Sequence, residues 1–103
     1  MRIEVTGDES ISKQARTYAE YRVFAALTHA AAARNVDHAR VVLRRIARKG
    51  ECDNVACTVT FAMNGSGSRR IRTIGDHAYA AINRAIERIA ALPPPRATAP
   101  IPS

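Results

Sequence analysis

Residues 73–83 read Thr73-Ile-Gly-Asp-His-Ala-Tyr-Ala-Ala-Ile-Asn83, and this stretch decides the fold. Its β-branched start is typical of a strand end, Gly75 favours a turn, and Asp76 is placed to cap a helix. The apolar residues that follow recur at helical spacing. They predict a last helix that ends near Leu92 and buries Tyr79, Ile82, Ile86 and Ile89.

Three segments with alternating apolar residues precede this stretch, at about residues 39–44, 55–63 and 69–74. Alternation with a period of two predicts a strand in each. Residues 48–54 are polar and rich in turn formers, and residues 64–68 read Asn-Gly-Ser-Gly-Ser, a strong hairpin signal. The three strands should therefore pair as consecutive antiparallel neighbours.

The N-terminal third adds one strand and one long helix. Residues 1–6 alternate as a half-buried strand, and residues 11–34 contain no Gly or Pro and are dense in alanine. Ser10 or Ser12 is positioned to cap this helix. Its inward stripe should consist of small and apolar residues, namely Ala15, Ala19, Val23, Ala26, Leu27 and Ala30.

The resulting fold class is α+β, in the order β-α-β-β-β-α. A strand, a helix and a second strand imply a right-handed crossover with parallel pairing, whereas the later strands are antiparallel. We predict a two-layer sandwich, with a four-stranded mixed sheet and two helices packed on one face. The folded domain should span residues 1–92, and the Pro-rich residues 93–103 should form a disordered tail.

The chain is strongly basic, with 16 Lys and Arg against 9 Asp and Glu and a net charge of +7. Only Lys13 and Lys49 are lysines, so the basic groups are nearly all guanidinium, which suits phosphate recognition. No apolar run is long enough for a membrane span, and we expect a cytoplasmic protein.

Cys52 and Cys57 are separated by four residues, and no second pair of cysteines is present in the sequence. A zinc site would lack ligands, so we expect reduced thiols and no metal or cofactor.

Three segments together resemble the short ribosome hibernation-promoting factors, also called ribosome-associated translation inhibitors. They are Ile3-Glu-Val-Thr-Gly7, the valine-rich strand from Val36 to Leu43, and the segment from Gly75 to Ile89. Within the last, Tyr79-Ala-Ala-Ile-Asn83 is close to the family's Tyr-Ala-Ala-Ile-Asp. The resemblance extends over about residues 1–92.

The resemblance implies a non-enzymatic factor that binds small-subunit rRNA in the mRNA and tRNA channel of the ribosome and blocks translation. It also implies that basic side chains on the helices press on rRNA phosphates. With a one-residue gap near Ser10, Arg16 and Arg22 match basic family positions on the first helix, and Arg88 matches one on the second. Lys13 and Arg84 join them as neighbours. Because the family's ribosome-pairing module is absent from this sequence, we expect a monomer off the ribosome, with no membrane partner and no small-molecule substrate.

The chain also departs from the family. Ala25 stands where a cation is expected, and Pro93 ends the second helix where family members often extend a lysine-rich end. The arginines concentrate instead on the second and fourth strands. Because side chains alternate along a strand, four of them should emerge from the uncovered sheet face, namely Arg40, Arg44, Arg70 and Arg72. We therefore predict a second, sheet-borne surface for rRNA.

Two other interpretations stay open. The last five elements are also similar in order to a double-stranded-RNA-binding module, which would make the chain a general RNA-binding domain. Alternatively, the chain is a stress-related protein-interaction modulator that uses Tyr21 and Phe24 or the Pro-rich tail. Tyr18, Tyr21 and Phe24 lie beside the apolar stripe of the first helix, and they either pack at its flank or form an exposed platform.

An enzyme is not expected, because the three histidines lie on separate elements and no nucleophile motif is present.

Overall fold

The computed structural model describes residues 1–29, 36–46, 54–63 and 67–92. Its elements follow the predicted order β-α-β-β-β-α, which confirms the fold class. They are β1 (Arg2–Gly7), α1 (Lys13–His29), β2 (Val36–Ile46), β3 (Asn54–Met63), β4 (Gly67–Gly75) and α2 (Ala78–Ala90). Several predictions fall outside the described residues: the end of the first helix at 30–34, most of the loop at 48–54, most of the hairpin turn at 64–68, Cys52 and the tail at 93–103.

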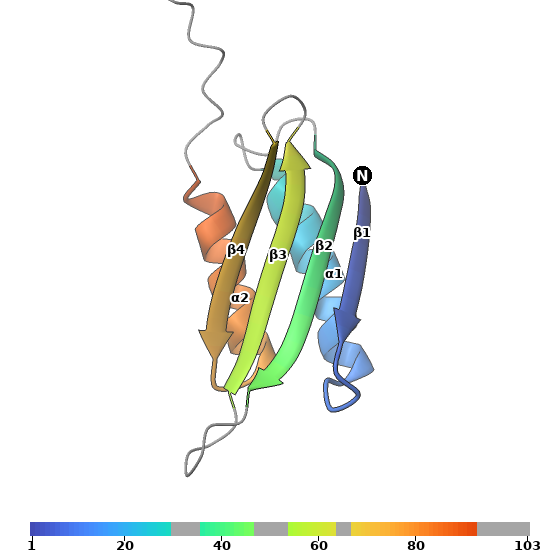
Figure 1. The fold of residues 1–103 in the computed structure, drawn as a ribbon, viewed down its shortest axis with the longest axis vertical. Coiled ribbons are helices and arrows are strands. Elements are labelled where there is room, and N and C mark those ends of the chain that lie inside the picture. Colours follow the sequence, from blue (N-terminus) through green and yellow to red (C-terminus); the bar gives the residue numbers. More distant parts are fainter. Residues whose placement is uncertain (30–35, 47–53, 64–66, 93–103) are drawn as a thin grey trace, which may run out of the picture.

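The four strands form one mixed sheet in the order β1-β2-β3-β4 (Figure 1). β1 and β2 pair in parallel, whereas β2 with β3 and β3 with β4 pair antiparallel. A cross-strand row runs from Arg40 through Thr60 to Arg70. This register fixes which side chains share a face of the sheet, and it confirms the predicted pairing.

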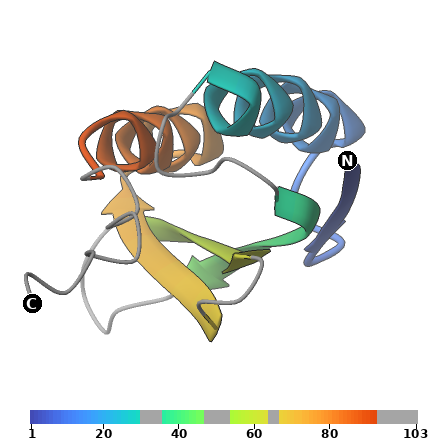
Figure 2. The same cartoon turned by 90° about the horizontal axis from the view of Figure 1, so that it is seen from above.

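Both helices cover the same face of the sheet, and the opposite face carries no helix (Figure 2). α1 contacts β1 and β2, α2 contacts β3 and β4, and the two helices contact each other. The core lies between the layers and includes Val41, Leu43 and Phe61, each at most 1% exposed. This two-layer arrangement confirms the predicted sandwich.

α1 begins as the sequence indicated. The Ser12 hydroxyl accepts a hydrogen bond from the Ala15 amide at 3.1 Å, so Ser12 rather than Ser10 satisfies the open helix end. The side chains buried by the helix are those of Ala15, Ala19, Val23 and Leu27. Three of the four are alanine or valine, and such small side chains let the helix lie close to the sheet.

The start of α2 differs from the prediction. His77, not Asp76, is the N-cap residue, and its Nδ1 accepts a hydrogen bond from the Ala80 amide at 3.1 Å. The buried stripe consists of Ala81, Ile82, Ala85 and Ile89, which confirms the predicted burial of Ile82 and Ile89, whereas Tyr79 is 39% exposed and Ile86 is only half-buried. Tyr79 lies at the margin of that stripe and packs edge to face on Tyr18, with ring centroids 5.0 Å apart.

Gly75 and Thr73 fix α2 against β4. A Cβ on Gly75 would lie 2.5 Å from the Ala81 nitrogen, so only glycine allows the first turn of α2 to approach this closely. The buried Thr73 hydroxyl donates a hydrogen bond to the Ala81 carbonyl at 2.7 Å. The stretch that decides the fold therefore also sets the distance between helix and sheet.

Candidate nucleic-acid interface

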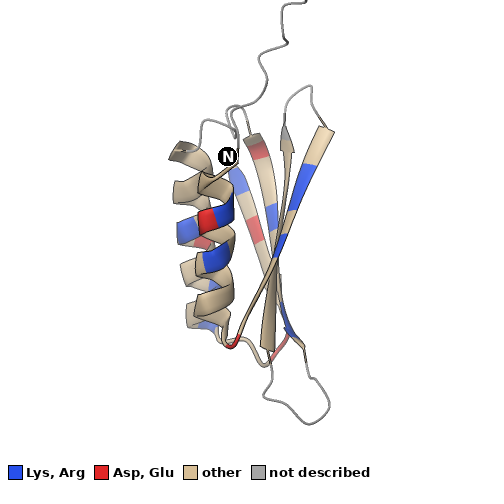
Figure 3. Cartoon of the chain, turned by 90° about the vertical axis from the view of Figure 1, so that its left-hand side faces the viewer, with Lys and Arg blue, Asp and Glu red and all other residues tan. Residues whose placement is uncertain are grey.

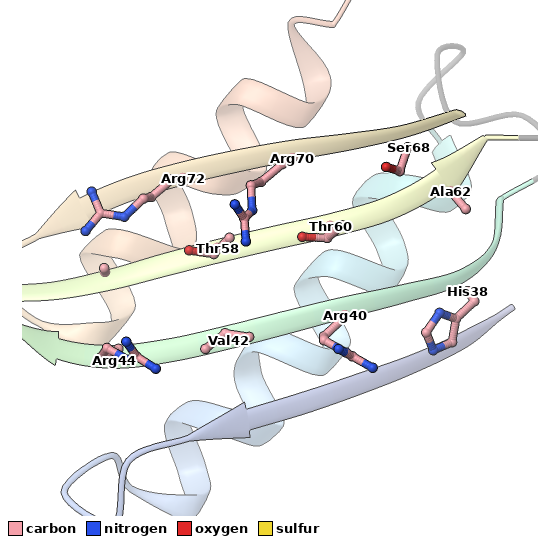
Figure 4. A pocket seen from close by; sticks show the side chains of 11 residues that line it. His38, Arg40, Val42, Arg44, Thr58, Thr60, Ala62, Ser68, Arg70 and Arg72 are labelled. Carbon is pink, nitrogen blue, oxygen red and sulfur yellow. The ribbon is translucent and has the colours of Figure 1, made fainter. Parts of the chain in front are cut away.

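The helix-free face of the sheet carries a shallow groove of about 600 Å³ that runs along β3 (Figure 4). β3 supplies small or hydroxyl-bearing residues in the middle, and β2 and β4 supply arginines on either side. The lining consists of His38, Arg40, Val42, Arg44, Ala56, Thr58, Thr60, Ala62, Ser68, Arg70 and Arg72. The structure thus brings together all four arginines that the sequence assigned to this face.

Strand register sets the spacing of these guanidinium groups. Arg40 and Arg70 lie in one row on either side of Thr60, and Arg72 lies beside Thr58 in the next row on the same face. Neighbouring strands are about 4.8 Å apart, so the backbones of β2 and β4 are separated by about 10 Å. The arginines of β2 and those of β4 therefore lie on either side of the hydroxyl groups of β3.

The charge on this face is largely uncompensated. Glu4 on β1 lies 3.7 Å from Arg40 and 3.7 Å from His38, and all three side chains are substantially exposed. Within the part of the chain that the structure describes, no carboxylate forms an ion pair with Arg44, Arg70 or Arg72. Among the described residues, four arginines of the groove therefore stand against one paired carboxylate, which leaves the groove electropositive.

The five helix-borne candidates lie in the opposite layer, so basic positions occur both on the helices and on the strands (Figure 3). On α1, Arg22 stands 6.0 Å from the ring centroid of Tyr18, and Arg16 is half-buried. Lys13 is exposed at the start of α1.

On α2, the two basic candidates reach towards β4. Arg84 donates a hydrogen bond to the Ile74 carbonyl, and Arg88 donates one to the Arg72 carbonyl at 3.4 Å. Arg84 and Arg88 therefore lie against β4, the strand that also carries Arg70 and Arg72.

Sequence reasoning missed two basic members of the helix-free face. His38 lines the groove, and Arg2 on β1 pairs in register with it. The alternation of residues 1–6 already placed Arg2 opposite the buried side of the strand, so the signal was present in the sequence. The same alternation placed Glu4 on that side, and the register of β1 with β2 in the structure puts it beside Arg40.

Other kinds of site have less support in the structure. Among residues 1–29, 36–46, 54–63 and 67–92, no group of three or more His, Cys, Asp or Glu side chains is arranged to hold a metal ion. Cys57 is buried, and burial raises the pKa of its thiol to about 12. No helix in the described part of the chain is long and apolar enough to cross a membrane.

The three aromatic residues on α1 that lie beside its apolar stripe differ in exposure, so they do not share one role. Tyr18 is half-buried, and its hydroxyl donates a hydrogen bond to Asn83 Oδ1 at 2.6 Å, so it links α1 to α2. Tyr21 is 77% exposed and Phe24 is 47% exposed. Tyr18 therefore packs at the flank of the core, and the other two rings face solvent.

The fold of the chain is similar to that of a protein of solved structure. No protein-family model matches the chain, and no curated protein matches its sequence. A solved structure described as a ribosomal subunit interface protein from Coxiella burnetii is similar, with a TM-score of 0.67 and 15% sequence identity. The match covers 87% of this chain and 90% of that chain. The chain therefore shares its fold with a ribosomal subunit interface protein.

Proposed function

We propose that this protein is a ribosome-associated factor of the hibernation-promoting type, which binds small-subunit rRNA in the mRNA and tRNA channel and inhibits translation. The observation that carries the proposal is a largely uncompensated arginine surface on the fold of a ribosomal subunit interface protein. The sequence resemblance over residues 1–92 points to the same family. Such a factor would act in the cytoplasm, where ribosomes work.

Binding of this kind needs no chemical step. Guanidinium groups form paired, charge-assisted hydrogen bonds with phosphate oxygens, and each contact releases condensed counterions from the RNA. These contacts read the shape and charge of folded RNA rather than its sequence. Occupying the channel then excludes messenger and transfer RNA by sterics alone.

Two features distinguish this proposal from the general RNA-binding alternative. The first turn of α2 follows Asp76 and His77, whereas a double-stranded-RNA module requires a basic helix start. The fold also matches that of the ribosomal subunit interface protein over 87% of this chain.

The protein-interaction alternative draws its support from the exposed Tyr21 and Phe24. A partner that stays bound after nuclease treatment, and is lost in a Tyr21→Ala, Phe24→Ala variant, would favour that alternative.

The test is co-sedimentation with purified ribosomes at several salt concentrations. We expect the wild type to pellet with ribosomes at low salt and to dissociate as salt rises. Arg16→Glu with Arg22→Glu should weaken pelleting through the helix layer, and Arg44→Glu with Arg72→Glu should weaken it through the sheet. Arg69→Glu is the control for charge reversal outside the groove, because Arg69 is exposed on β4 but does not line the groove. Unchanged pelleting of both double variants would reject the proposal.

A further inference from the structure

We infer that the groove on the helix-free sheet face binds one strand of RNA lengthwise along β3, through phosphates and without base stacking. The inference rests on the proposed function, because it assigns a form of RNA to a surface that the whole protein would bring to the ribosome. It concerns this groove alone, so it can fail while ribosome binding stands.

The distribution of charge favours a backbone lying along the groove. Arg70 and Arg72 are two residues apart on β4, so their Cα atoms are about 6.6 Å apart along the strand. Arg40 and Arg44 line the opposite side on β2. A phosphate chain running parallel to β3 would have guanidinium forks on both flanks.

The floor of the groove offers hydroxyl groups and no ring on which a base could stack. Thr58 and Thr60 are half-buried in the middle, next to the small Ala56 and Ala62. Among the described residues, the imidazole of His38, at one end, is the only aromatic ring that lines the groove. Proteins that hold unpaired bases use aromatic platforms, so recognition here must go to phosphate and sugar.

The width of the groove favours a strand over a duplex. The backbones of β2 and β4 lie about 10 Å apart, which leaves room for one phosphate backbone over β3 between the arginines of the two flanking strands. A duplex would rest on the ends of the arginines and leave the hydroxyls of Thr58 and Thr60 out of reach. A single backbone can contact the arginines and the floor together.

The two edges of the groove differ in charge, and this difference determines where the RNA backbone lies. Glu4 stands on the β1 side, where it neutralises part of the charge of Arg40 and would repel a phosphate. On the β4 side, Arg88 bonds to the Arg72 carbonyl and adds a cation at that edge. We therefore expect the RNA backbone to lie nearer to β4 than to β2.

The experiment measures binding of a fluorescent oligouridine of about ten nucleotides to the full chain by anisotropy, from about 50 to 300 mM salt. An Arg70→Gln, Arg72→Gln variant loses two phosphate contacts. Its plot of log affinity against log salt should be shallower by about 1.4, since each contact to a single strand contributes about 0.7. If the two proteins bind equally at 1 M salt, this difference makes the variant bind about 25-fold more weakly than the wild type at 0.1 M salt.

Two comparisons make the result specific. Arg69→Gln, on the same strand but outside the groove, should leave the oligouridine slope unchanged. Thr58→Val, which removes one hydroxyl and no charge, should weaken binding severalfold with an unchanged slope. Circular dichroism of each variant checks that the fold is retained.

The inference is overturned if the Arg70→Gln, Arg72→Gln variant has the wild-type slope, or if a duplex of equal length binds as tightly as the strand. Failure of the proposed function would give a different experimental result. In that case the wild type stays out of ribosome pellets, whatever the oligouridine does. Ribosome pelleting without oligouridine binding would reject the groove inference and leave the proposed function standing.

Discussion

Replacing Gly75 by alanine should destabilise the protein more than any other exchange of glycine for alanine in the described chain. The added Cβ would lie 2.5 Å from the Ala81 nitrogen and 2.9 Å from the Ala80 carbonyl carbon. Both are backbone atoms of α2, so no side-chain rotation can relieve the contact. The first turn of α2 must move away from β4.

The cost has two parts. Forcing a group into a packed interface costs about 1–3 kcal/mol. Moving α2 also weakens the buried hydrogen bond from Thr73 to the Ala81 carbonyl, which is worth about 1 kcal/mol. We therefore expect a loss of about 2–4 kcal/mol in the free energy of unfolding, a large share of the stability of a domain this size.

Gly67→Ala is the matched control. Gly67 has a φ of 78°, and a Cβ there would meet nothing within 4 Å. Alanine at that position carries only the cost of left-handed backbone, about 1–2 kcal/mol. Equilibrium urea unfolding followed by far-ultraviolet circular dichroism measures both variants. If Gly75→Ala loses no more stability than Gly67→Ala, the close approach of α2 to β4 is not what requires glycine.

Three further changes test other parts of the structure. His77→Ala should cost about 1 kcal/mol of unfolding free energy, because the N-cap acceptor is lost, and His77→Ser should restore most of it; equal stabilities would argue against the cap. Burial holds the pKa of Cys57 at about 12 against an ordinary 9.0, so the unfolded thiol ionises first and stability should fall as pH rises from 9 to 12. That fall should be smaller in Cys57→Ala, and an identical pH profile would contradict the assignment. Tyr18→Phe removes the hydroxyl that bonds to Asn83 and should cost about 0.5–1.5 kcal/mol in a urea titration, whereas a neutral result would mean that solvent replaces the bond.

The sequence was sufficient to predict the sheet and the face from which its arginines emerge. Side chains in β4 alternate with a period of two, so burial of Ile71 and Thr73 places Arg70 and Arg72 on the other face. The same alternation in β3 places Thr58 and Thr60 on that face. These features depend on local spacing, which a sequence displays directly.

The first residue of α2 could not be predicted as securely from the sequence. Asp76 and His77 both offer a side-chain acceptor, and only the path of the chain out of β4 decides that His77 is the N-cap. Tyr79 follows the helical spacing of the core but lies at its margin, where it packs on Tyr18 of α1. The required glycine at position 75 likewise depends on how closely α2 approaches the sheet, which is a tertiary distance.

Charge compensation was the other property that the sequence did not display. A count of residues shows a net charge of +7, but it does not show which acids stand beside which arginines. In the structure Glu4 lies beside Arg40, at the β1 side of the face. The helix-borne cations were assigned by family resemblance, and their contact with rRNA remains a prediction.

Sedimentation of the wild-type protein with ribosomes through a sucrose gradient tests the central claim most directly. We predict that the protein migrates with small subunits and whole ribosomes at low salt, and that high salt returns it to the top of the gradient. The Arg44→Glu, Arg72→Glu variant should migrate with ribosomes less than Arg69→Glu does. A folded wild-type protein that stays at the top of the gradient even at low salt would contradict the account.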